Sequence, residues 1–301
     1  MLIELALRRR IALVRDPNRR RTPLGDRIVE VLDDRQTGET ILDEALRMMK
    51  GQEHDKISIN SWVDLLSGEF SLLFLQVTRP LSSLAEIDSQ LRMLMLCTGE
   101  TWNVMKIGYQ LKQVRERLAK GLVDKGVLRT EKRNFLLFDM ATHPVADVRT
   151  KEAIVNRVVN LLTSTTSAIP PSALDKEGIQ CRVARAVCLV CAGYTANVLD
   201  NAFGRLGYEE REAAFARADE ILAEFSCWPL GGGDAANSST ARRRQAVAAG
   251  RVASGGDPNG RESVLGLITE VRREAAAGDD DVGFELIAGV LEVLSKLDSL
   301  L

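Results

Sequence analysis

Hydrophobic residues recur at helical spacing over much of the chain, which predicts a mostly helical fold. In the segment 37–50, Ile41, Leu42, Ala45 and Met49 fall on one face of a helix that Thr37 is expected to cap. The same spacing predicts further helices over residues 58–68, 101–126, 149–163, 179–203, 208–225 and 283–301, and residues 1–8 resemble the end of a helix.

Short alternating runs predict one or two β-hairpins. Residues 10–14 and 28–34 flank a turn at Asp16-Pro17-Asn18 and a basic stretch at 19–27, a pattern similar to a winged helix. Residues 127–144 alternate and turn like a hairpin that Pro144 ends. We therefore expect one globular helical domain, residues 1–301, with one or two β-hairpins.

Two segments do not fit this domain. Residues 230–263 are rich in Gly, Ala, Ser and Arg and lack an apolar period, so they are expected to form a disordered loop. Residues 70–100 are apolar and lie between two copies of one dipeptide, Gly68-Glu69 and Gly99-Glu100. Charged and amide side chains interrupt this run and Pro80 breaks it, which argues against a membrane span.

Composition narrows the class of protein. Of the 301 residues, 45% are hydrophobic, which is enough for a substantial core. The net charge is −2, so an anionic partner must be met by a local patch. Five sparse cysteines in mostly apolar surroundings fit reduced thiols in the cytosol or nucleus. The first ten residues lack the charge order of a signal peptide, and Met1 opens directly on an amphipathic helix, so we expect a native segment upstream of it.

Catalytic and metal-binding motifs are missing from the sequence. Cys188 and Cys191 form a CxxC without a second pair or a nearby His, so they are expected to pack in the core. His54 and His143 have no nucleophile close by in sequence, and no phosphate loop, dinucleotide fingerprint or GxSxG is present. We therefore expect no enzyme, no metal site and no cofactor.

The segment 109–126 carries a possible anion site. On a helix, Lys112 and Arg115 are neighbours at i,i+3, while Arg117 and Lys120 point about 100–140° away from them. Lys plus Arg suits a phosphate monoester, which needs convergent cations. Spacing alone also permits an ordinary solvated face, in which Glu116 pairs with Lys112.

Four segments resemble the Golgi phosphoprotein 3 family, and in particular its fungal vacuolar-protein-sorting members. They are "SWVDLLSGE", the long run "TWNVMKIGYQLKQVRERLAKGLVDKGVLRTEKRNFLLFDMATHPVAD", "TANVLDNAF" and "ELIAGVLEVLSKLDSLL". The resemblance implies a mostly helical adaptor on the cytoplasmic face of Golgi membranes that exchanges with the cytosol. It also implies binding to phosphatidylinositol 4-phosphate and the formation of homo-oligomers. The implied protein partners are the cytosolic tails of Golgi glycosyltransferases, which are thereby retained or retrieved, and the coatomer coat.

The family's functional residues can be carried over onto matching positions. Its Lys/Arg-x-x-Arg headgroup pair falls on Lys112 and Arg115, and its hairpin for self-association and membrane contact falls on residues 131–142. The apolar tip of that hairpin would be Phe135, Leu136 and Leu137. The family's pocket also uses a Trp and an Arg upstream of the stretch aligned with Met1, and its basic coat-binding tail lies further upstream. This chain is therefore expected to be N-terminally truncated and to bind membranes less tightly.

The resemblance also bears on the segment 70–100, because family members run from "LLSGE" straight into "TWN". The repeated Gly-Glu predicts a translated intron, since GTGAGT can read within Gly68-Glu69-Phe70 and a terminal CAG within Thr98-Gly99. Genomic codons without GT or AG at those positions would exclude it. The alternative is a packed helix, for which Leu81, Leu84, Ile87, Leu91 and Leu94 have suitable spacing.

A nucleic-acid-binding protein is the alternative function. It would use the winged-helix-like N-terminus with the arginines of 8–10 and 19–21. The net charge of −2 and the lack of an interleaved aromatic and basic stripe weigh against it, so no nucleic-acid partner is expected.

Overall fold

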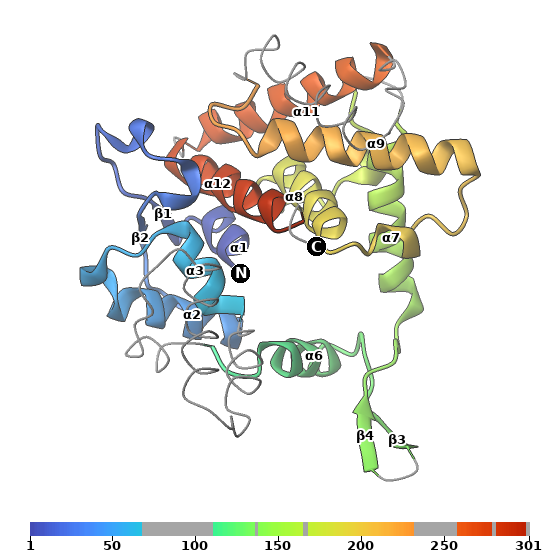
Figure 1. Ribbon diagram of the computed structural model, residues 1–301. Helices are drawn as coiled ribbons and strands as arrows, with labels where there is room; N and C mark the ends of the chain where they lie inside the picture. Colours follow the sequence, from blue (N-terminus) through green and yellow to red (C-terminus); the bar gives the residue numbers. More distant parts are fainter. Residues whose placement is uncertain (68–110, 136–137, 165–167, 232–257, 279–280, 299–301) are drawn as a thin grey trace, which may run out of the picture.

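The computed structural model describes residues 1–67, 111–135, 138–164, 168–231, 258–278 and 281–298. Their helices are α1 (Leu2–Leu7), α2 (Thr40–Gly51), α3 (Ile59–Ser67), α6 (Val114–Asp124), α7 (Val148–Thr163), α8 (Arg182–Thr195), α9 (Tyr208–Phe225), α11 (Pro258–Ala277) and α12 (Asp281–Asp298). Two antiparallel pairs accompany them: β1 (Ile11–Leu13) with β2 (Val29–Val31), and β3 (Glu131–Phe135) with β4 (Phe138–Thr142). The predicted mostly helical fold is confirmed (Figure 1).

Helix α12 lies in the middle of the core. It packs against α1, β1, α3, α8, α9 and α11 (Figure 1). A helix with neighbours on several sides must be apolar on several sides, and α12 buries Val282, Phe284, Leu286, Ile287, Ala288, Val290, Leu291 and Val293. Gly289 permits the close crossing with α3, because a Cβ there would overlap Cδ1 of Ile59 and lie 3.4 Å from the carbonyl oxygen of Leu24.

Ion pairs hold the connection between β1 and β2 against α12. All three β1 residues are buried, and β1 pairs with β2 in a register that sets Ile11 opposite Val31. In the connection, Arg19 and Arg27 both reach the buried carboxylate of Glu285, with Arg19 Nε 3.1 Å from Oε2. The winged-helix-like pattern of the sequence thus corresponds to a short hairpin folded against α12.

Helix α6 begins later than the sequence pattern predicts. Of the predicted helix 101–126, residues 101–110 lie outside the described residues. Gln113 adopts a left-handed conformation with φ 52°, which interrupts any helix there, and α6 starts at Val114. The predicted start is therefore wrong within the described part. The glycine stop is confirmed, because α6 ends at Asp124 and Gly126 has φ +72°.

Other boundaries also differ from the predictions. The helix predicted over 179–203 is shorter, because Cys181 and Asn197 both have positive φ and α8 spans Arg182–Thr195 between them. Thr37 does not cap α2, since its N–H and hydroxyl both donate to Oδ1 of Asp43 at 2.6 Å. These hydrogen bonds lower the pKa of Asp43.

The sequence pattern does not predict helix α11. This helix starts at Pro258, inside the predicted loop 230–263, so the predicted C-terminal end of that loop is wrong. Proline fits the first turn of a helix because its missing N–H would have no partner there. The rest of the loop beyond residue 231, and the predicted insertion at 70–100, lie outside the described residues.

Candidate functional site

The predicted headgroup pair lies where the chain enters α6. Leu111 anchors this entry, because its side chain is 1% exposed and its N–H donates to the carbonyl of Leu65 at 3.3 Å. Lys112 follows in a bend and Arg115 lies in the first turn of α6; both are exposed. Within the described part of the chain, neither side chain makes an ion pair. Two cations close in sequence are thus available to an anion.

The local geometry differs from the helical face that the spacing predicted. Because α6 starts at Val114, Lys112 precedes the helix and does not share a helical face with Arg115. The alternative pair between Lys112 and Glu116 is not formed either. The position of Lys112 relative to Arg115 is therefore set by the bend at Gln113 and by the buried Leu111.

Two other cations of this segment form ion pairs with glutamates of α2 and its N-cap. Arg117 makes an ion pair with Glu44, and Nζ of Lys125 lies 2.6 Å from Oε1 of Glu39. Residues two apart on an α-helix point about 200° apart around its axis, so Arg117 faces α2 while Arg115 faces away from it. The two glutamates were not singled out from the sequence, because nothing local links them to residues 73 and 86 positions away.

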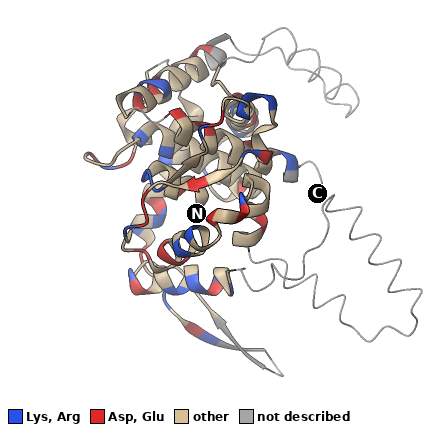
Figure 2. Ribbon diagram, turned by 90° about the vertical axis from the view of Figure 1, so that its left-hand side faces the viewer, with Lys and Arg blue, Asp and Glu red and all other residues tan. Residues whose placement is uncertain are grey.

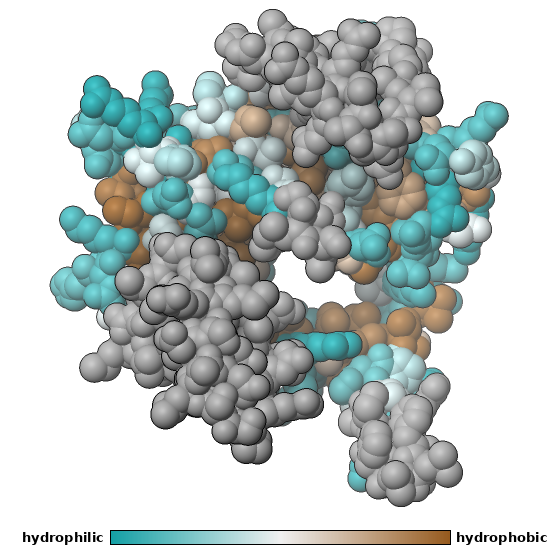
Figure 3. Space-filling view, in the orientation of Figure 1, coloured by the Kyte–Doolittle hydropathy of each residue, from teal (hydrophilic) through white to brown (hydrophobic). Residues whose placement is uncertain are grey.

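An exposed apolar row accompanies these cations. Helix α6 buries none of its described side chains, and Leu118 and Leu122 on it are 47% and 41% exposed. Val148, at the start of α7, is 56% exposed. In Figure 3 apolar surface lies over α6 and the beginning of α7. Apolar and cationic side chains in one small area are the combination that a membrane surface or a partner protein can cover.

The hairpin β3–β4 extends away from the helical body beyond α6 and α7 (Figure 1). Its register runs from Glu131 opposite Thr142 to Phe135 opposite Phe138, so two residues connect the strands. Phe135 is the last residue of β3, whereas Leu136 and Leu137 lie outside the described residues. The predicted hairpin is confirmed, while the role of its tip stays a prediction.

Backbone hydrogen bonds also join the two segments at the base of the hairpin, one leading from α6 and the other leading into α7. The N–H of Arg129 donates to the carbonyl of Pro144 at 3.0 Å, and the N–H of Ala146 donates to the carbonyl of Val127 at 2.9 Å. The carboxylate of Asp147 then caps α7 by accepting from the N–H of Arg149 at 3.0 Å and that of Thr150 at 3.3 Å. Hydrogen bonds from Thr150 lower the pKa of Asp147. The cationic entry of α6 and the hairpin thus form one connected segment.

Several of the N-terminal arginines that a nucleic-acid-binding protein would use form ion pairs with acidic side chains of the protein itself. Arg10 pairs with Asp33, Arg8 Nε lies 2.6 Å from Oε1 of Glu4, and Arg19 is bound to Glu285 as described above. In Figure 2 basic and acidic positions are interspersed over the described ribbon, without a broad area of one sign. These ties favour a structural role for the arginines over contact with nucleic acid.

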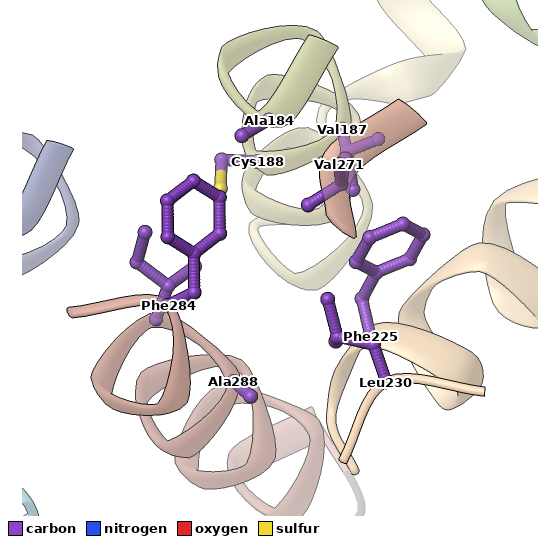
Figure 4. A pocket seen from close by; sticks show the side chains of 9 residues that line it. Ala184, Val187, Cys188, Phe225, Leu230, Val271, Phe284 and Ala288 are labelled. Carbon is purple, nitrogen blue, oxygen red and sulfur yellow. The ribbon is translucent and has the colours of Figure 1, made fainter. Parts of the chain in front are cut away.

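A cavity between α8, α9, α11 and α12 has no catalytic character. Its lining is apolar (Figure 4) and consists of Ala184, Val187, Cys188, Phe225, Leu230, Val271, Phe284, Ile287 and Ala288. A catalytic pocket needs a few convergent polar groups, which this lining does not supply. Burial raises the pKa of the Cys188 thiol to about 12 and also raises that of Cys191, so both stay neutral. The predicted packing of both cysteines in the core is confirmed.

Two further features are absent from the described residues. They contain no group of three or more His, Cys, Asp or Glu side chains placed to hold a metal ion. Among the described helices, none is both long and apolar enough to cross a bilayer.

Comparison with known proteins decides the family. The model of the Golgi phosphoprotein 3 (GPP34) family matches residues 1–247. The chain belongs to this family. It is 43% identical over 301 residues to vacuolar protein sorting-associated protein 74 of Schizosaccharomyces pombe, covering 100% of this chain and 73% of that protein. It is 45% identical over 230 residues to the protein of that name in Eremothecium gossypii, covering 76% of this chain and 60% of that protein.

Membership in the Golgi phosphoprotein 3 family confirms the resemblance found in the sequence. It assigns the chain a Golgi-associated role in protein trafficking, and the family names describe trafficking proteins rather than enzymes. The finer predictions concern the lipid, the cargo and the coat.

Proposed function

We propose that this protein is a peripheral Golgi membrane adaptor that binds phosphatidylinositol 4-phosphate. In this role it sits on the cytoplasmic face of the membrane, exchanges with the cytosol and assembles into homo-oligomers. It binds the cytosolic tails of Golgi glycosyltransferases and links them to the coatomer coat, so that these enzymes are retained or retrieved. Family membership supports the Golgi location and the trafficking role.

The observation that carries the lipid proposal is the pair of exposed cations at the entry to α6, which form no ion pair with the residues that the structure describes. A phosphate monoester carries close to two negative charges near neutral pH and accepts several hydrogen bonds. Lys112 and Arg115 supply both charges, and the guanidinium can bind two phosphate oxygens at once. A phosphodiester lipid such as phosphatidylserine lacks this concentrated charge, so the pair favours the 4-phosphate headgroup.

The apolar surface nearby supports contact with a membrane rather than with a soluble phosphate alone. Leu118 and Leu122 are exposed beside the cations, and the hairpin tip carries Phe135, Leu136 and Leu137 in sequence. Apolar side chains that enter the headgroup region add binding energy to the electrostatic attraction. The hairpin, which lies beyond the C-terminal end of α6, would thus act with its tip as a wedge at the opposite end of α6 from the headgroup pair. In the assembled protein it would also contact other copies.

The decisive experiment measures flotation of the 301-residue chain with vesicles that contain phosphatidylinositol 4-phosphate. The comparison vesicles contain phosphatidylserine at equal surface charge. Replacement of both cations, Lys112→Ala/Arg115→Ala, should weaken binding to the 4-phosphate vesicles at least tenfold, because each charge-assisted contact contributes about 1.5–3 kcal/mol. A second version with an N-terminal extension that carries the Trp and Arg of the family pocket should bind more tightly than the chain itself.

Arg20→Ala/Arg21→Ala is the matched control, because it removes two exposed cations from the β1–β2 connection, on another part of the molecule. This variant should keep its preference for the 4-phosphate vesicles. Equal losses in both double variants would mean that the protein responds to net charge, and the headgroup assignment would then be wrong.

A further inference from the structure

Helix α6 has few contacts that fix its rotation about its own axis. A core helix is held by side chains that insert between its neighbours, but α6 buries none of its described side chains. Its entry is fixed by the buried Leu111 and by Val114, which packs partly buried against the core, and its exit by the turn at Gly126. Between these ends, the ion pairs with α2 are the directional contacts that the described structure provides.

Both ion pairs act on one side of the helix. Arg117 and Lys125 are eight residues apart, which corresponds to a rotation of about 80° around the axis. Glu44 and Glu39 therefore hold this side of α6 against α2. Arg115 lies about 200° from Arg117 and is consequently turned outward, toward solvent and away from α2.

We infer that Glu39 and Glu44 determine lipid specificity. They mask Arg117 on α6 and Lys125 at its C-cap, and they orient Arg115. This inference rests on the proposed function of Lys112 and Arg115. With Arg117 and Lys125 neutralised, an approaching membrane meets fewer free cations on this segment, and binding depends more on a headgroup that concentrates its charge at one point. With the glutamates removed, two more cations become available to any anionic lipid, whatever its headgroup.

The expected change in vesicle binding can be derived from the number of cations that each variant frees. A cation near an anionic bilayer strengthens binding roughly fivefold, so one unmasked arginine should raise binding to phosphatidylserine vesicles by about that factor. Binding to 4-phosphate vesicles should rise less, because α6 can now rotate and Arg115 loses its fixed orientation. The ratio of the two affinities should therefore fall at least about threefold.

The test compares Glu44→Gln and Glu39→Gln in the 301-residue chain, with both vesicle types at equal surface charge. Glu53→Gln is the matched control, because it also removes one negative charge near α2 and frees one cation, Lys50, whose Nζ lies 2.8 Å from Oε2 of Glu53. The control should keep the wild-type ratio. A merely structural role for Glu44 would lower the melting temperature without raising binding to phosphatidylserine.

Charge reversal provides a rescue. Glu44→Arg alone should lower the selectivity further, and Glu44→Arg/Arg117→Glu should restore it, because the ion pair is rebuilt with opposite polarity and unchanged net charge. If the wild type prefers 4-phosphate vesicles and Glu44→Gln keeps the same ratio as Glu53→Gln, the inference about the glutamates is wrong while the proposed function stands. If the wild type shows no preference, the proposed function fails and the masking role fails with it.

Discussion

The helices around α12 and the helix α6 are held in place by different forces. Helix α12 buries apolar side chains on several sides, whereas α6 leaves Leu118 and Leu122 exposed and meets α2 through ion pairs. Salt does not screen apolar burial, whereas it weakens partly exposed ion pairs. The proposed lipid site thus lies on a segment whose position depends on ion pairs. Binding elements commonly belong to such less firmly packed parts of a protein.

The largest expected difference in stability is between loss of the buried ion pairs at Glu285 and loss of the partly exposed ion pair at Glu44. Glu285 is fully buried between Arg19 and Arg27, so Glu285→Gln leaves Arg27 buried without a counter-charge. The free energy of unfolding should fall by about 3–5 kcal/mol. For Glu44→Gln, whose ion pair with Arg117 is partly exposed, the loss should be about 0–1 kcal/mol. Urea unfolding of both variants measures this difference, and equal losses would show that α6 is as firmly held as the core.

Replacing a leucine by alanine should give the next largest difference in stability between α12 and α6. Leu291 on α12 is 0% exposed, and Leu291→Ala should cost about 2–5 kcal/mol through the lost contacts and the cavity left behind. Leu122→Ala on α6 should cost less than about 1 kcal/mol. Thermal unfolding followed by circular dichroism would compare them. A large loss for Leu122→Ala would reveal a partner surface that covers α6 in solution.

Replacing a glycine by alanine should lower the stability in α12 and raise it in α6. At Gly289 a Cβ would overlap the buried Ile59, so Gly289→Ala should destabilise the protein by about 1–3 kcal/mol. At Gly121 in α6 a Cβ has no neighbour within 4 Å, so Gly121→Ala should stabilise by about 0.5–1 kcal/mol through its higher helix propensity. Chemical denaturation curves of the two variants should shift in opposite directions.

The smallest expected effect is on thiol reactivity, with no change in stability. The raised pKa of Cys188 and Cys191 means that deprotonation, and therefore alkylation, would need a pH well above neutral. Cys227 is exposed. At pH 8, iodoacetamide should therefore modify Cys227 while Cys188 and Cys191 stay unmodified in the folded protein, as peptide mass mapping can measure. Rapid modification of Cys188 would mean that the core around α8 opens readily.

Much of the fold could be predicted from the sequence, because burial imposes a period. The apolar spacing of α2, α9 and α12 reflects faces that pack in the core, and the period of two around the hairpin reflects its paired strands. Helix ends were less predictable, since the left-handed Gln113 breaks no apolar pattern. Helix α11 did have a signal at Val264, Leu267, Ile268, Val271 and Ala275, but the biased composition before it hid its start.

The candidate site was only partly predictable. Lys112 and Arg115 came from the resemblance to a family, and the helical spacing alone would have placed them on one face that the bend at Gln113 does not allow. Glu39 and Glu44 could not have been found, because their partners are joined to them through the packing of α2 beside α6. Such long-range pairs leave no local pattern in the sequence.

The central place of α12 has a consequence for synthesis on the ribosome. This helix packs against α1 and β1, which leave the exit tunnel long before it does. The apolar residues of α1 and β1 therefore remain without their partner until α12 has been translated, and contacts of such long sequence separation form slowly. During that interval Leu5, Ile11 and Leu13, which are fully buried in the finished protein, are open to other molecules. Nascent chains of this protein should therefore depend on chaperones that cover apolar segments until α12 emerges.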